Sequence, residues 1–134
     1  MAEITVPAKV DNIPEVTEFV DSILEACDCP MKVQMQIDIA IDEIFSNIAF
    51  YAYDNEGDAT VVIDTEKEPG VIHLTFIDSG KPYDPLEKED PDVTLSAEER
   101  NIGGLGIFMV KKSMDDMVYE YTDGKNILKL KKTM

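Results

Sequence analysis

The feature that most constrains this chain is a glycine cluster that runs directly into an apolar helical pattern. Residues 101–116 read NIGGLGIFMVKKSMDD, which places three glycines within four positions. Such a cluster exposes backbone N–H groups at a helix N-terminus, where the positive end of the helix dipole favours phosphate. Because glycines also serve tight turns and close packing, the cluster indicates a phosphate site only in combination with other motifs.

Patterns along the rest of the chain predict one α/β unit. Runs of β-branched and aromatic residues bounded by turn residues predict five strands, at 2–8, 59–65, 71–78, 117–122 and 125–132. Apolar residues three or four apart predict three helices, one beginning near Asn12 and Pro14, one from Pro30 to Tyr53, and one from Gly104 to about Met114. Asp123–Gly124 between the last two strands is typical of a hairpin turn. With 134 residues, the chain is expected to form a single domain, 1–134.

The composition is that of a soluble globular protein and argues against nucleic-acid binding. No apolar run approaches the roughly 20 residues that span a bilayer, and the start MAEITVPAKV lacks a signal-peptide core, so a cytoplasmic location is expected. The net charge of −16 repels nucleic acid and anionic membranes, so neither is expected as a direct partner. The same charge would repel nucleotide phosphates unless Mg²⁺ and a helix N-terminus offset it locally.

The cysteines do not suggest a metal centre. Cys27 and Cys29 lie one residue apart, and no second group of metal ligands accompanies them. We therefore interpret both as reduced thiols at a helix end.

A carboxylate and a carboxamide share one face of the second predicted helix. In DEIFSN, residues 42–47, Glu43 and Asn47 are four residues apart, so both side chains lie on one side of the helix, offset from its apolar stripe. The amide oxygen suits a Mg²⁺ ion and the carboxylate suits proton transfer, as a Mg²⁺–nucleotide site requires. Spacing alone leaves two alternatives open: an ordinary polar helix face, and the rival pair Asp42 and Ser46.

A second polar motif follows the predicted strand 71–78. Asp78 ends this apolar run, and Gly80 comes two residues later. The aspartate can accept a hydrogen bond from an exocyclic amino group while the glycine lets the backbone approach a flat ring, although Asp-x-Gly is more often a simple turn. Beyond Gly80, an aperiodic acidic stretch runs to Arg100, the one arginine of the chain, whose fork geometry suits a terminal phosphate.

Taken together, these motifs resemble the GHKL ATP-binding fold, and within it the stand-alone anti-sigma factor serine/threonine kinases. The blocks DEIFSNIAFYAY, FIDSGKPYDP and RNIGGLGIFMVKKSMDD carry the resemblance, which covers nearly the whole chain. It implies an α/β (α+β) two-layer sandwich, in which a mixed, largely antiparallel sheet carries helices on one face. ATP would lie between the helices and a lid at about 84–102.

The matching positions imply a role for each site residue. Glu43 would be the general base that activates a serine or threonine hydroxyl on a partner protein, and Asn47 would ligate Mg²⁺. Asp78 would read the adenine amino group, and Gly80 would permit close approach of the base. The phosphates would be wrapped by a group of residues at the end of the lid: Arg100, Gly103, Gly104, Leu105 and Gly106.

The resemblance also implies an activity and partners. The chain would be a Mg-ATP-dependent kinase that phosphorylates an anti-anti-sigma (STAS-type) protein and sequesters a sigma factor, and family members often form homodimers. The alternative is a related ATP-binding regulatory module that acts by binding a partner with weak or no phosphate transfer. A detached catalytic domain of a histidine kinase fits less well, because the one histidine, His73, lies within a strand pattern. If the chain were an interaction protein that binds no nucleotide, the occurrence of the three motifs together would be a coincidence.

Two positions depart from the pattern of the family. Tyr51 stands where relatives commonly have a histidine, and Lys129 stands where a small hydroxyl residue is frequent in the last strand. Neither change removes the expected nucleotide site, but both bear on kinase efficiency and on the identity of the partner.

Overall fold

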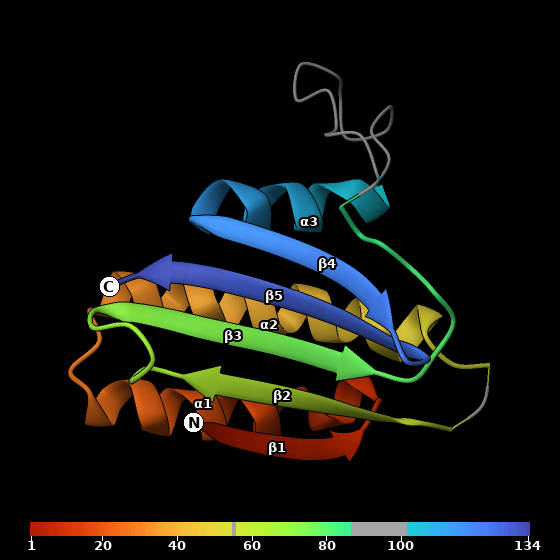
Figure 1. Cartoon of the computed structure of the whole chain (residues 1–134), viewed down its shortest axis with the longest axis horizontal. Coiled ribbons are helices and arrows are strands. Elements are labelled where there is room, and N and C mark those ends of the chain that lie inside the picture. Colours follow the sequence, from red (N-terminus) through yellow and green to blue (C-terminus); the bar gives the residue numbers. More distant parts are fainter. Residues whose placement is uncertain (55, 87–101) are drawn as a thin grey trace.

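A single β-sheet is the platform of the fold. The computed structural model describes residues 1–54, 56–86 and 102–134, with the backbone alone at 102–105. Five strands form the sheet in the order β1-β2-β3-β5-β4, and every neighbouring pair is antiparallel (Figure 1). The strands are Ala2–Pro7 (β1), Asp58–Asp64 (β2), Val71–Asp78 (β3), Asp116–Thr122 (β4) and Lys125–Thr133 (β5).

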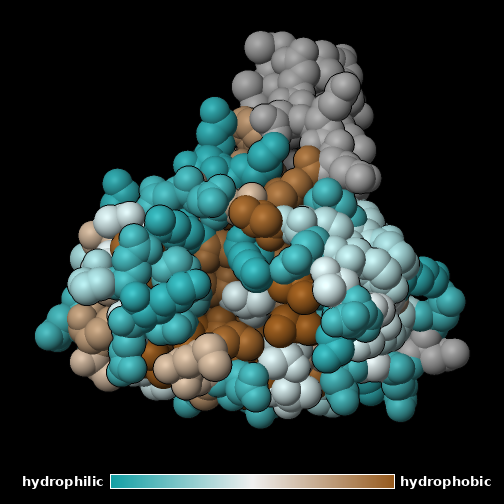
Figure 2. Space-filling view, viewed as in Figure 1, coloured by the Kyte–Doolittle hydropathy of each residue, from teal (hydrophilic) through white to brown (hydrophobic). Residues whose placement is uncertain are grey.

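Alternation along the strands buries one face of the sheet. The fully buried side chains of the neighbouring strands β2 and β3 are Ala59, Val61, Ile63, Ile72, Leu74 and Phe76. Successive side chains point to opposite faces, so the residues between them face solvent. Figure 2 views this second face, on which hydrophilic side chains surround smaller hydrophobic areas. Such a one-sided pattern is common in antiparallel sheets.

Three α-helices supply the second layer. They are α1 (Ile13–Ala26), α2 (Met31–Tyr51) and α3 (Ile102–Ser113), and a 3₁₀ helix, η1 (Val10–Asn12), leads into α1. Helices α1 and α2 lie behind the sheet, and α3 lies toward its β4 side (Figure 1). The buried residues of α1 recur every three or four positions, namely Ile13, Val16, Val20 and Leu24. This spacing gives the helix one continuous apolar face against the core.

The boundaries of the helices differ slightly from the expected ones. Asn12 precedes α1 as expected, but its side-chain amide donates to the Pro7 carbonyl at 2.9 Å and makes no capping bond. Helix α2 ends at Tyr51 and not at Tyr53, and the following Ala52 carbonyl accepts the N–H of Lys81 at 2.8 Å. This bond ties the end of α2 to the loop after β3.

The expected architecture is confirmed, and the sheet is antiparallel at every described pairing. Asp123 and Gly124 have φ values of 54° and 76°, as the predicted two-residue hairpin requires. Within the described ranges, no helix combines the length and apolar character needed to cross a membrane. Most of the expected lid, including Arg100, falls on residues 87–101, which lie outside the described ranges.

Candidate functional site

The site begins where the end of β3 meets the end of α2. Asp78, the last residue of β3, is only 5% exposed, and its Oδ1 accepts the backbone N–H of Gly80 at 2.9 Å. A Cβ atom on Gly80 would lie 2.1 Å from the Ala52 carbonyl oxygen, a contact that no real side chain makes. Only glycine therefore allows the chain after Asp78 to pass so close to α2.

A buried amide from β5 completes the surroundings of Asp78. Asn126 is 6% exposed and lies opposite Asp78 in the sheet register. Its Nδ2 donates to Asp78 Oδ1 at 2.9 Å and to the Lys81 carbonyl at 2.8 Å. Its Oδ1 accepts the backbone N–H of Tyr83 at 3.1 Å and the hydroxyl of Tyr119. Asn126 thus joins β5, β4 and the loop after β3 around a single carboxylate.

Within the described residues, hydrogen bonds engage only one of the two oxygens of Asp78. Both described donors to this side chain, the Gly80 N–H and the Asn126 amide, bind Oδ1. Among the described residues, none donates to Oδ2. A carboxylate held in this way has a fixed orientation and a free acceptor, which suits a ligand with an amino group.

Asp78 stands at the wall of a largely apolar cavity of about 430 Å³, counting the part open to solvent. The cavity is lined by Ile44, Asn47, Ile48, Ala52, Phe76, Asp78, Lys81, Tyr83, Pro85, Ile107, Tyr119, Asn126 and Leu128. The residues come from α2, β3, α3, β4 and β5 and from the segments that follow α2 and β3, so the cavity lies between the helical layer and the sheet. A narrow apolar cavity with one buried acceptor can hold a flat heterocycle that carries an amino group.

Of the two polar residues expected to share a face of α2, Asn47 lines this cavity and Glu43 lies one turn away. Asp42 is exposed, and neither it nor Ser46 lines the cavity. The helix therefore presents Asn47, and not the rival Ser46, to the space beside Asp78. The Asn47 carboxamide offers a single oxygen ligand toward a cation there.

Glu43 instead lies against α3. A Cβ atom on Gly106 would come within 1.8 Å of Glu43 Oε2, so the glycine backbone rests directly on the carboxylate. Burial, followed by the nearby Asp42 charge, raises the pKa of Glu43. A raised pKa makes a carboxylate a better proton acceptor near neutral pH.

The glycine cluster lies inside the start of α3. Helix α3 begins at Ile102, so Gly103, Gly104, Leu105 and Gly106 occupy its first turns and do not form a loop before it. The first four N–H groups of a helix lack partners within the helix and point out of its N-terminus. This geometry suits an anion, although Arg100 lies outside the described residues.

Sequence reasoning missed Asn126, Tyr83 and Tyr119. Asn126 follows a hairpin turn, where asparagine usually serves the turn itself. Asn126 lies two and four residues before Leu128 and Leu130, so the alternation of side chains along β5 places all three on the buried face. This alternation is the sequence signal that could have identified Asn126. Lys129, expected to mark a departure near the site, points to the opposite face and pairs with Glu120 at 3.1 Å. Asn126 is the residue of this strand that contacts Asp78.

Tyr51, the other noted departure, packs at the mouth of this region. Its ring stacks on that of Tyr83, with centroids 5.8 Å apart and planes inclined by 28°. Tyr83 lines the cavity, so Tyr51 contacts its wall from the end of α2. An aromatic ring at this position therefore supports the loop that follows Asp78.

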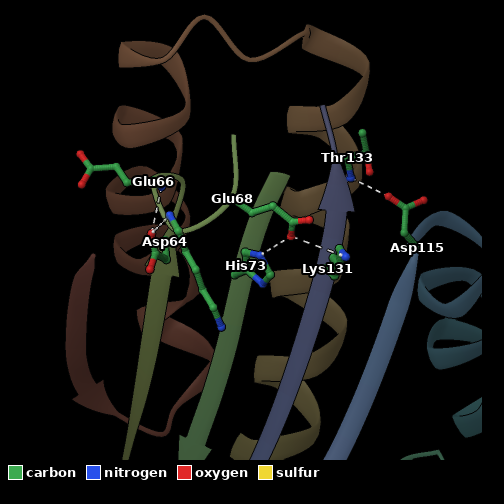
Figure 3. A network of polar contacts seen from close by, with 8 residues as sticks. Asp64, Glu66, Glu68, His73, Asp115, Lys131 and Thr133 are labelled. Carbon is green, nitrogen blue, oxygen red and sulfur yellow. Dashed lines mark hydrogen bonds and ion pairs between the residues drawn. The ribbon is translucent and has the colours of Figure 1, made fainter. Parts of the chain in front are cut away.

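His73 lies near the opposite end of β3 and takes part in a polar network (Figure 3). Its Nε2 is 3.2 Å from Glu68 Oε2, which also lies 3.6 Å from Lys131 Nζ. An imidazole paired in this way within a strand is part of the sheet surface. This position agrees with the structural interpretation of His73 and gives no support to a phosphate-accepting role.

The cysteines take no part in the site. Both Cys27 and Cys29 are free thiols at the end of α1, as expected. No cluster of three or more His, Cys, Asp or Glu side chains suited to a metal occurs in the part of the chain that the structure describes.

The antiparallel sheet and the helices that cover one of its faces define an α+β two-layer domain with a cavity between the layers. The family model for the histidine kinase-like ATPase domain matches residues 6–132, and the chain belongs to this family. Membership in a family of ATPase domains implies that ATP is the ligand.

The curated relatives that match at low sequence identity include two kinases and an anti-sigma factor. The chain is 27% identical to a serine-protein kinase RsbW of Listeria monocytogenes over 97 residues, which cover 69% of this chain and 62% of that protein. It is 24% identical to the serine/threonine-protein kinase BtrW of Bordetella bronchiseptica, covering 74% of this chain and 70% of the relative. It is 25% identical to an anti-sigma F factor of Geobacillus kaustophilus, covering 84% and 77%. The chain thus spans less than two thirds of the length of the Listeria relative.

Proposed function

We propose that this chain, as one domain over 1–134, is a Mg-ATP-dependent serine/threonine protein kinase of the cytoplasm. Its substrate would be an anti-anti-sigma (STAS-type) protein, and it would also sequester a sigma factor. The names of the relatives support this proposal, since they include serine kinases and an anti-sigma factor. A homodimer is the assembly that we expect.

The Asp78 cavity is the single observation that carries the proposal. The free Oδ2 would accept a hydrogen bond from the exocyclic amino group of adenine, while Asn126 and Gly80 hold the carboxylate in place. The apolar lining would cover the faces of the ring and exclude water. Burial strengthens a hydrogen bond of this kind relative to one in water.

Phosphate binding and phosphate transfer would use residues beside the cavity. Asn47 would hold Mg²⁺, which neutralises phosphate charge when bound. The backbone N–H groups of Gly103, Gly104 and Leu105, with Gly106 and Arg100 nearby, would contact the phosphate oxygens. Glu43 would take the proton from the attacking hydroxyl, whose oxygen bonds to the γ-phosphorus while ADP leaves.

A second candidate function is supported by the contact between Glu43 and Gly106. Glu43 lies against α3, is only partly exposed and does not line the cavity, so the residue expected to act as base does not face the candidate nucleotide pocket. A regulatory module that binds ATP and a partner, with weak or no phosphate transfer, would tolerate this arrangement. In the kinase, Glu43 would instead have to turn from α3 toward the hydroxyl of the partner.

Phosphate transfer from radiolabelled ATP separates the two candidates. The assay combines the chain, Mg²⁺ and an anti-anti-sigma protein from the same cell, and compares wild type with Glu43→Ala and with the control Glu120→Ala. We expect label on the substrate with wild type and the control, and a loss of at least about 100-fold in Glu43→Ala, in the range typical of a general base. Transfer undiminished in Glu43→Ala would remove this residue from its role. ATP binding without transfer by wild type would favour the regulatory module.

A further inference from the structure

The outer face of α2 carries a row of exposed apolar side chains. Met31, Met35 and Ile39 are 68%, 56% and 52% exposed, although side chains of this type are usually buried. They are four residues apart, so they follow one another along the helix over about 12 Å at 1.5 Å per residue. We call these three residues the methionine ridge.

A row of carboxylates runs along the α1 side of the methionine ridge. We call it the acidic strip: Glu18, Asp21 and Glu25 of α1, with Asp38 of α2. Glu25 Oε1 accepts a 3.4 Å hydrogen bond from Gln34 Nε2 of α2, which fixes how the two helices pair here. Asp38 is one turn beyond Gln34 and so lies on the same side of α2, between the ridge and α1.

The negative charge of the acidic strip is poorly compensated. Helix α1 contains no lysine or arginine, and α2 contains only Lys32. The Oδ1 atoms of Asp21 and Asp38 are buried and accept no hydrogen bond from any described residue. Burial, the Asp21 carboxyl and the Glu25 charge raise the pKa of Asp38 to about 7. A positive charge placed beside these carboxylates would therefore be stabilised.

The outer face of α1 is also hollowed next to the strip. A shallow groove is lined by Ile13, Pro14, Thr17, Glu18, Asp21, Ser22 and Glu25. Its acidic wall is formed by the three α1 members of the acidic strip, Glu18, Asp21 and Glu25, so a side chain that enters the groove meets carboxylates and no cation.

We propose that the methionine ridge and the acidic strip together dock an amphipathic helix of a partner protein, with apolar residues on the ridge and lysine or arginine side chains at the strip. Methionine side chains are flexible and polarisable, and they adapt to the shape of an apolar partner. Charge complementarity selects a cationic helix, because the strip and the net charge of −16 repel acidic ones. The acidic strip also disfavours a second copy of this chain at this particular surface. The proposal does not depend on the nucleotide site.

The first test uses methionine methyl NMR on the full chain with a designed peptide as probe. The peptide is an amphipathic helix of about 18 residues, with leucine on one face and lysine on the other. We expect saturable shifts at the methyls of Met31 and Met35, while Met109 and Met117 stay unchanged. A peptide of the same composition in scrambled order should give no saturable shift. Shifts at all four methyls, or at none, would overturn the proposal.

The second test compares the affinity of the peptide for matched variants. Met35→Ala/Ile39→Ala should bind at least fivefold more weakly than wild type, whereas Val118→Ala, an equally exposed apolar residue on β4, should differ by less than twofold. Glu18→Gln/Glu25→Gln should also lose at least fivefold, and the exposed control Glu3→Gln/Glu120→Gln should not. An equal loss of affinity in Glu18→Gln/Glu25→Gln and in its control Glu3→Gln/Glu120→Gln would mean that binding follows net charge alone, which would overturn the proposal. A dimer that dissociates on Met35→Ala/Ile39→Ala would instead assign the ridge to self-association and overturn the proposal.

Discussion

At the residue scale, Asn126 has more partners than any sequence pattern suggested. It donates to Asp78 and to the Lys81 carbonyl, and it accepts from Tyr83 and Tyr119. Any other side chain at this position would need a similar amide in order to donate and accept these hydrogen bonds together. The residue is therefore both a structural link and a means of orienting the candidate ligand-binding carboxylate.

Replacing Asn126 should weaken the fold as well as the site. Asn126→Ala leaves buried partners unpaired, and we expect the free energy of unfolding to fall by about 2 kcal/mol. Urea denaturation monitored by circular dichroism measures this change. Asn12→Ala, which removes an exposed hydrogen bond to Pro7, serves as the control and should have a much smaller effect. A loss in Asn126→Ala no larger than that of the control would contradict the described network.

Gly106 and Glu43 should show energetic coupling. Gly106→Ala brings a methyl group against the Glu43 carboxylate, which is the end of a flexible side chain and can turn aside, so we expect a destabilisation below about 1 kcal/mol. Glu43→Ala removes the obstacle, so the double variant should recover most of that loss and benefit from the helix propensity of alanine. A double-mutant cycle by denaturation gives the coupling energy. Additive effects of the two substitutions would show that the residues do not touch.

At the scale of elements, the α1–α2 pair contains a pH-sensitive contact. The pKa of Asp38 is raised to about 7 from 3.8, chiefly by burial and then by Asp21 and Glu25. Between these values the folded state holds more protons than the unfolded state, so the stability contributed by this group falls as pH rises toward 7. The pairing of the two helices should therefore weaken as pH rises from about 4 to about 7.

Asp38→Asn should stabilise the protein above neutral pH more than below it. We expect a gain of about 1 kcal/mol near pH 8 and little gain near pH 5, well below what the full pKa shift would convert to, because solvent screens this partly exposed group. Urea denaturation at both pH values measures the difference. Asp11→Asn, an exposed change on η1, is the control. An equal effect of Asp38→Asn at both pH values would contradict the interpretation.

Most of the secondary structure could be predicted from the sequence, because the spacing of the apolar residues differs between helices and strands. The run 71–78 matches β3 because its apolar residues lie between clear turn signals. The end of α2 was misplaced because Ala52 and Tyr53 continue the apolar spacing, whereas the chain turns there to meet the loop at Gly80. Local patterns cannot reveal such a long-range contact.

The candidate site could be predicted only in part, because some of its contacts join residues far apart in the sequence. Asp78, Gly80 and Asn47 were found from motifs and reach one cavity. Asn126 was not found, because its role depends on the pairing of β3 with β5 across 48 positions of the chain. The contact of Gly106 with Glu43 likewise depends on how α3 packs on α2.

At the scale of the whole molecule, the acidic charge should act on stability through self-repulsion. The net charge of −16 on 134 residues leaves many carboxylates without a nearby cation. Raising the salt concentration from about 0.02 to about 0.3 M shortens the Debye length and should raise the Tm by several degrees. Differential scanning calorimetry with sodium chloride measures this. A Tm that falls over this range would mean that attractive ion pairs dominate.

We propose above that Asp78 reads the amino group of an adenine nucleotide. Isothermal titration calorimetry with Mg-ATP and Mg-inosine triphosphate, which lacks that amino group, tests it on wild type, Asp78→Asn and the control Asp11→Asn. We predict that wild type and the control prefer ATP by at least about tenfold, or 1.4 kcal/mol, and that Asp78→Asn loses most of this preference. Equal affinity of wild type for the two nucleotides, or a preference that Asp78→Asn leaves unchanged, would contradict the account.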